Sequence, residues 1–243
     1  MHSESCERLI LSITLFLIVF APLAYGAVER WERNVVLLSI GSMAGIWLWR
    51  FVSLGRPRLL FPPFFPPTVL FLVLTALQLV PLPGALRDFF TPARLPLVTA
   101  GADSAKWVPL TANPGKTAVG AVSVAACLAF CVVLLNTFRN RRWVKITLTV
   151  LLTLGSFEAL YGLVEYWTGH QHIFWYQKIY YLEEVTGTYI NHNHFAGLLV
   201  PIFVLAIGVF VVRFARFVAG RSYTFAEDSR SIWKKVTSTA RLL

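Results

Sequence analysis

The side chains best suited to bind a ligand are gathered between Gly187 and Leu199, where the chain reads G-T-Y-I-N-H-N-H-F-A-G-L-L. Those that can form hydrogen bonds run directly into a long apolar stretch; they are Thr188, Asn191, His192, Asn193 and His194. Amide and imidazole groups are costly to place at a membrane boundary unless water or a polar ligand receives them. The segment therefore predicts the rim of a cavity, with these side chains as substrate-binding residues.

Four of the five histidines form two His-x-His pairs in the same region, His170 with His172 and His192 with His194. Together they could supply nitrogen ligands to a metal ion, but residues two apart share a face only on a strand, and no Cys or Asp stands beside them. Two alternatives stay open: interfacial histidines hydrogen-bonded to backbone or water, and a site in which Asn and His contact an anionic or sugar ligand. We predict no metal.

Two carboxylates lie within an otherwise apolar run upstream of this motif. Glu158, Tyr161 and Glu165 are spaced at i, i+3 and i+7, which places them on one face of a helix. Carboxylates inside a spanning helix usually face a bundle interior or a water-filled cavity. Glu158 and Glu165 therefore join the predicted substrate site. A structural partner such as Arg or Asn is the alternative for either, and Glu165 could be solvated at the outer boundary.

The composition indicates a membrane protein. Of 243 residues, 56% are hydrophobic and 14% charged, and the mean hydropathy is +0.63. The net charge of +10 comes from Lys and Arg scattered between apolar runs, where they act as topology signals. No basic stripe interleaved with aromatics is present, so we expect no nucleic-acid partner. Cys127 and Cys131 fall inside an apolar run and are expected to be small buried hydrophobes.

These features predict an all-α fold, a polytopic transmembrane helical bundle of about six spans in contact with the lipid bilayer. The transmembrane domain covers 1–218, followed at 219–243 by a cytoplasmic tail or the start of a missing second half. The first apolar run could instead be a signal peptide, since Ala24-Tyr25-Gly26 resembles a small-x-small cleavage site. The predicted spans are 9–26, 34–52, 62–80, 117–137, 143–167 and 194–214.

The third run, Leu59 to Val80, is interrupted by prolines at 62, 63, 66 and 67. Because proline disrupts a helix interior, we expect a regular helix only from about Thr68, and Thr68 to Val80 alone is too short to cross. Either the proline segment extends the crossing or the run is re-entrant. We expect it to cross.

The distribution of Lys and Arg predicts the orientation. The connections after spans two, four and six hold three, four and seven such residues, against two and one after spans one and five. Both termini are then cytoplasmic and the Gly187 motif faces outward. The long third connection holds four and obeys the rule poorly, and the assignment changes if the third run does not cross.

Residues 186–199, T-G-T-Y-I-N-H-N-H-F-A-G-L-L, resemble the G-T-F-x-N-x-N-H-x-A-x-x-L motif of the O-antigen ligase and polymerase family of bacterial membrane proteins. Three further stretches agree in order along the chain. A-P-L-A-Y-G-A-V-E at 21–29 is similar to the end of that family's first span, Q-L-V-P-L-P at 78–83 to the end of its third, and A-L-Y-G-L-V-E-Y at 159–166 to its fifth.

The resemblance implies an inner-membrane enzyme of cell-surface polysaccharide assembly. Such an enzyme transfers a glycan from an undecaprenyl-diphosphate carrier to an acceptor at the outer face, without a cofactor. The acceptor is lipid A core, a growing polysaccharide or a protein hydroxyl. Cations or amide donors at the boundary could stabilise the diphosphate leaving group.

Family members are usually longer, and their catalytic Arg and His lie beyond the region matched here. Asp228-Ser229-Arg230-Ser231 only distantly resembles the S-R-G-type motif that usually comes next. We therefore expect a fragment, a short relative, or one chain of a pair whose second chain holds the remaining domain. The catalytic residues stay unassigned. Two other functions remain open: a non-enzymatic membrane partner of a separate catalytic chain, and a His/Glu-based metal or proton-coupled transporter.

Overall fold

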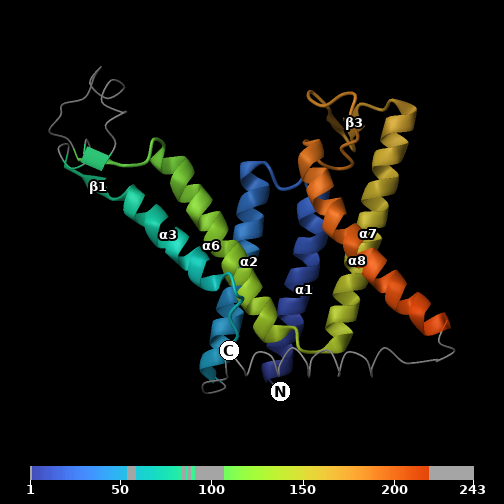
Figure 1. The fold of residues 1–243 in the computed structure, drawn as a ribbon, viewed down its shortest axis with the longest axis horizontal. Coiled ribbons are helices and arrows are strands. Elements are labelled where there is room, and N and C mark those ends of the chain that lie inside the picture. Colours follow the sequence, from blue (N-terminus) through green and yellow to red (C-terminus); the bar gives the residue numbers. More distant parts are fainter. Residues whose placement is uncertain (1, 54–58, 84–85, 87–88, 91–106, 219–243) are drawn as a thin grey trace. The chain divides into compact units, whose positions relative to one another are not determined.

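The computed structural model describes residues 2–53, 59–83, 86, 89–90 and 107–218. The predicted tail at 219–243 and most of the third connection lie outside the described residues. Within them the fold consists of six helices and two small antiparallel sheets of two strands each (Figure 1). The helices are α1 (His2–Leu23), α2 (Arg30–Ser53), α3 (Phe65–Leu79), α6 (Pro114–Thr137), α7 (Arg141–Thr168) and α8 (His192–Val218). One sheet pairs β1 (Pro81–Leu82) with β2 (Val108–Pro109), and the other is a hairpin of β3 (His172–Ile173) and β4 (Tyr176–Gln177).

The all-α prediction is confirmed, and the protein is a multi-pass membrane protein. Five of the helices are long and apolar enough to cross a bilayer. Because an α-helix rises 1.5 Å per residue, about 20 residues cross the roughly 30 Å hydrocarbon core. These segments overlap the predicted spans and end within a few residues of them at most boundaries; they are Glu4–Leu23, Arg30–Ser53, Pro114–Thr137, Arg141–Thr168 and His192–Val218. The orientation across the membrane stays a prediction.

The chain divides into two compact units. The first comprises Met1–Ile13 and Leu37–Thr137, and therefore includes α3 and α6. The second comprises Thr14–Val36 and Phe138–Leu243, and therefore includes α7, α8 and the connection between them. All the predicted site residues belong to the second unit.

In the first unit, α3 begins earlier than expected. It starts at Phe65, so the predicted start near Thr68 is wrong. Pro66 and Pro67 occupy the first turn, where a helix has no partner for the backbone N–H that proline lacks. The helix still has only 15 residues, fewer than a crossing requires.

An extended segment lengthens this third run. The side chain of Asn136, near the end of α6, bonds both backbone groups of Leu60 at 2.9 Å, while the backbone N of Thr111, before α6 begins, donates to Gln78 O at 3.2 Å. Residues 60–78 therefore run antiparallel to α6 along nearly all of its 24 residues. This arrangement favours the expected crossing, with the proline segment supplying the missing length.

In the second unit, local sequence fixes both ends of α7. The side chain of Asn140 accepts a hydrogen bond from the backbone N of Arg142, as an N-cap does. At the other end Gly169 adopts φ +66°, and the backbone N of His170 bonds Glu165 O at 3.1 Å. Helix α8 packs closely on α7 at Gly155, where an added Cβ would lie 2.5 Å from Ile202 Cγ2. These two helices position the candidate site.

Candidate functional site

The connection between α7 and α8, residues 169–191, is anchored to α7 by Tyr161. The Tyr161 hydroxyl accepts a hydrogen bond from the backbone N of Phe174 at 2.9 Å, at the turn between β3 and β4. Phe174 has φ +53°, an uncommon conformation for a residue with a side chain. Trp175 completes this turn and is 85% exposed. Tyr161 therefore serves the predicted site by holding the hairpin.

Glu158 and Thr188 meet in what we call the α7 junction, together with the carbonyl of Pro22. The backbone N of Thr188 lies 3.0 Å from Glu158 Oε2, and Thr188 Oγ1 lies 2.5 Å from Glu158 Oε1 and 2.9 Å from Pro22 O. Both side chains are 0% exposed. Glu158 and Thr188 therefore bind each other in this structure, and their contact with substrate stays a prediction. Their role is to position the chain that precedes α8.

Close packing around glycine surrounds the α7 junction. Gly187 has φ +56°, and an added Cβ would lie 2.3 Å from Phe195 Cε2. Gly26 has φ +78° and faces the ring of Tyr189, where a Cβ would lie 2.6 Å from Cδ1. Burial raises the pKa of the Tyr189 hydroxyl, and the neighbouring Glu158 raises it further. The Tyr189 ring thus packs between the end of α1 and the start of α8.

Glu165, two turns further along α7, has a different environment. Its carboxylate is paired with Lys178, with Nζ 3.1 Å from Oε1, and Lys178 Nζ also donates to Glu184 O at 3.2 Å. Glu165 is 6% exposed, so the alternative of a simply solvated carboxylate is wrong. The pair borders a cavity of about 550 Å³, which we call the loop cavity. It is lined by Glu165, Tyr166, Trp167, Gly169, His170, Gln171, Lys178, Leu182, Glu183 and Glu184.

The Asn/His residues of the motif separate into distinct roles. Asn191 precedes α8, and its Oδ1 accepts a hydrogen bond from the backbone N of Asn193 at 2.8 Å, as an N-cap does. His192 Nδ1 forms a close ion-pair contact with Glu184 Oε2, and its ring stands edge-on to Tyr181 with centroids 4.6 Å apart. Asn193 and His194 are exposed. Among the Asn/His residues of the motif, these last two are the most exposed.

The four histidines do not form one cluster of ligands. The rings of His170 and His172 lie 5.0 Å apart between centroids, but His192 faces Glu184. Across the described ranges, no group of three or more His, Cys, Asp or Glu side chains has the geometry to hold a metal ion.

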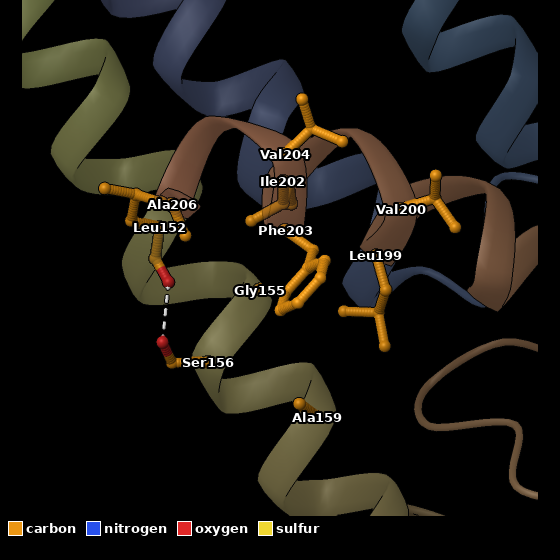
Figure 2. Close-up of a pocket in the computed structure, with 10 residues that line it drawn as sticks. All are labelled: Leu152, Gly155, Ser156, Ala159, Leu199, Val200, Ile202, Phe203, Val204 and Ala206. Carbon is orange, nitrogen blue, oxygen red and sulfur yellow. Dashed lines mark hydrogen bonds between the residues drawn. The ribbon is translucent and has the colours of Figure 1, made fainter. Parts of the chain in front are cut away.

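A second hollow, the α7–α8 groove, lies further along the two helices (Figure 2). It encloses about 460 Å³. The Ser156 hydroxyl donates to Leu152 O at 2.9 Å, so the groove's polar side chain is already satisfied. The other lining side chains are small or apolar; they are Leu152, Gly155, Ala159, Leu199, Val200, Ile202, Phe203, Val204 and Ala206. The groove therefore offers a surface suited to hydrocarbon.

Sequence reasoning missed two participants. Lys178 is the only Lys or Arg between Lys145 and Arg213, and a buried Glu165 needs a cation, so the signal was present. Pro22 contributes only its carbonyl, which any residue could supply. Its place in the A-P-L-A-Y-G stretch gave no indication that it would meet Thr188, 166 positions later.

The chain was compared with protein-family models, curated proteins and solved structures, and none of the three comparisons found a match. The resemblance to O-antigen ligases therefore rests on the four ordered stretches, and function must be argued from the site.

Proposed function

We propose that this protein acts in the transfer of a glycan from an undecaprenyl-diphosphate carrier at the outer face of the bacterial inner membrane, as the resemblance to O-antigen ligases implies. One observation supports this function most directly. Helices α7 and α8 together form an apolar groove along their length and a polar site at the ends joined by residues 169–191. A substrate that fits both must have a hydrocarbon tail and a polar head.

The α7–α8 groove would hold part of the polyprenyl tail. Val200, Phe203 and Val204 are more than half exposed in this structure, so apolar surface is available to a chain lying against it. Burying such surface releases about 25 cal/mol per Å². A flexible unsaturated chain could fill the space beside Gly155 and Ala159, because these two residues are small.

The start of α8 would hold the diphosphate. The positive end of the α8 dipole lies at its first turn and favours phosphate. The backbone N–H groups of Asn193, His194 and Phe195 are already bonded to Asn191, so the side chains of that turn would supply the hydrogen bonds. Asn193 and His194 lie in that turn with exposed side chains able to donate hydrogen bonds. From His194 to Val200 the helix rises about 9 Å. A single lipid-linked molecule could therefore place its head group at the first turn and its tail in the groove.

The α7 junction would fix the geometry of this site. It ties residue 188 to both α7 and the end of α1, and so sets where α8 begins. Asn191 then caps the helix. In this proposal Thr188, Glu158 and Asn191 position the site, while Asn193 and His194 contact substrate. A second chain with the remaining family domain would complete the catalytic centre.

The test uses the host strain lacking the gene, complemented with variants of the full chain and supplied with its native partners. We expect His194→Ala and Ala159→Trp each to lower transfer of lipid-linked glycan at least tenfold, the second by filling the groove. Leu160→Trp is the matched control, because Leu160 is 63% exposed on the same helix and does not line the groove. Transfer at the wild-type level in both His194→Ala and Ala159→Trp would contradict the proposal.

A further inference from the structure

We propose that the loop cavity binds the sugar next to the diphosphate, a neutral polyhydroxylated ring, while the diphosphate itself stays outside at the start of α8. This inference rests on the proposed function and assigns the glycan part of the substrate to specific side chains. Those that act directly are Glu165, Gln171 and Trp167, and Lys178 holds Glu165 in place.

Hydrogen-bond acceptors without donors border the loop cavity and support this assignment. Glu165 Oε1 is contacted by Lys178 Nζ at 3.1 Å, whereas Glu165 Oε2 and Gln171 Oε1 have no hydrogen-bond donor among the described residues. All these oxygens are inaccessible to solvent, and both residues border the loop cavity. Buried acceptors without donors are rare because each costs free energy. A ligand with several O–H groups would satisfy them together once the side chains that cover these oxygens move aside, because in this structure they have almost no accessible surface.

The orientation of Gln171 is fixed by its other end. Its Nε2 donates to Leu182 O at 2.7 Å, and a carbonyl can accept only from the amide nitrogen. The side-chain oxygen is thereby left without a donor. The backbone O of Gln171 also accepts a hydrogen bond from the backbone N of Lys178 at 2.9 Å, so both the backbone and the side chain of Gln171 are fixed. A preorganised acceptor of this kind loses little entropy when a ligand binds.

Aromatic side chains at the opening suit the other face of a sugar. Tyr166 and Trp167 border the cavity and are 59% and 75% exposed. The face of an aromatic ring carries partial negative charge, which attracts the polarised C–H groups on one side of a pyranose. A pocket of about 550 Å³ falls within the range usual for small-molecule sites, with room for one or two sugar rings.

The charge of the cavity argues against phosphate inside it. Glu165, Glu183 and Glu184 contribute three carboxylates and Lys178 one ammonium group, a formal excess of two negative charges. His192 adds a positive charge beside Glu184 only if it is protonated. Phosphate oxygens are acceptors only and would meet both like charge and unpaired acceptors. A sugar supplies donors without charge, which is what the cavity lacks.

The test measures the affinity of the full chain in phosphatidylethanolamine/phosphatidylglycerol nanodiscs, in EDTA, for two probes. One is the host's undecaprenyl-diphosphate-linked glycan, and the other is undecaprenyl diphosphate without sugar. We expect the glycan-bearing probe to bind wild type about tenfold more tightly, the effect of one or two hydrogen bonds. Gln171→Ala and Trp167→Ala should reduce this ratio to about two or less without changing the affinity for bare carrier.

Trp175→Ala is the matched control, because Trp175 is an exposed tryptophan of the same connection that does not border the cavity. It should keep the wild-type ratio. Equal binding of the two probes to wild type, or an unchanged ratio in both cavity variants, would overturn the inference and leave the proposed function standing. Glycan-dependent binding that requires a divalent cation would also overturn it. Failure of wild type to bind either probe would refute the proposed function, and the inference with it.

Discussion

Glu158 and Glu165 are the same residue type on the same face of the same helix, and both are buried, yet their surroundings differ. Both oxygens of Glu158 lie at hydrogen-bond distance from Thr188. Glu165 has Lys178 Nζ 3.1 Å from Oε1, and its Oε2 has no hydrogen-bond donor among the described residues. Glu158 therefore links α7 to the segment before α8, whereas Glu165 can still bind a ligand.

This difference shows that burial is a poor guide to function in a membrane-spanning helix. By exposure alone, Glu158 at 0% and Glu165 at 6% would be assigned the same role. The two glutamates differ in which of their oxygens already have hydrogen-bond donors. An oxygen that has its donors is not available to a ligand. The comparison can be tested by removing the partners of each carboxyl.

The largest effect is expected at the Lys178 pair. Lys178→Met removes the cation and leaves Glu165 buried without compensation, which typically costs 3 to about 5 kcal/mol of stability. The measurement is the free energy of unfolding by SDS titration in mixed micelles. The double variant Lys178→Met with Glu165→Leu should recover more than half of the loss, since two apolar side chains need no partner. A neutral Lys178→Met would show that the ion pair does not stabilise this region.

A smaller effect is expected at the α7 junction. Glu158→Ala leaves the backbone N–H of Thr188 buried without an acceptor, which should cost about 2 to 3 kcal/mol on the same titration.

Glu158→Gln is the informative control for that variant. The single proton of Thr188 Oγ1 cannot serve both Glu158 and Pro22, whereas a glutamine amide would donate to the hydroxyl and leave its proton for the Pro22 carbonyl. We therefore expect Glu158→Gln to remain within about 0.5 kcal/mol of wild type. A loss equal to that of Glu158→Ala would show that the negative charge itself is required, and would bring Glu158 closer in role to Glu165.

The smallest effect is expected at Asn191, which tests whether the positioning role extends into the motif. Removing an N-cap side chain costs about 1 kcal/mol, so Asn191→Ala should lower the free energy of unfolding by that amount. Asn191→Asp keeps the acceptor and should be close to wild type. If Asn191→Ala were instead fully stable but unable to bind the carrier, Asn191 would belong with Asn193 and His194 as a substrate contact.

The helices could be predicted from sequence because their signals are local. Mean hydropathy over about 20 residues marks the spanning segments, and Asn140, Gly169 and Asn191 mark their ends through caps that need only neighbouring residues. The start of α3 was misplaced because consecutive prolines were expected to prevent a helix, whereas the first turn of a helix accepts them.

The site was predicted only in part. Sequence brought the Asn/His motif and the two glutamates toward the same end of α7 and α8, because they flank the connection that joins the two helices. It could not place Lys178 beside Glu165, since that pairing depends on how residues 169–185 fold back on α7.

The sequence by itself determined an all-helical membrane protein with polar chemistry gathered beside its last apolar helix, because hydropathy and helical spacing act along the chain. Only the tertiary structure decided which polar groups are already satisfied. Thr188 obtains its partners from residues 30 and 166 positions away, and Glu165 obtains a cation at Oε1 but no hydrogen-bond donor for Oε2 from the described residues. Hydrogen bonds depend on distance and angle in space, so the distinction between a positioning carboxyl and one open to a ligand is not determined along the chain.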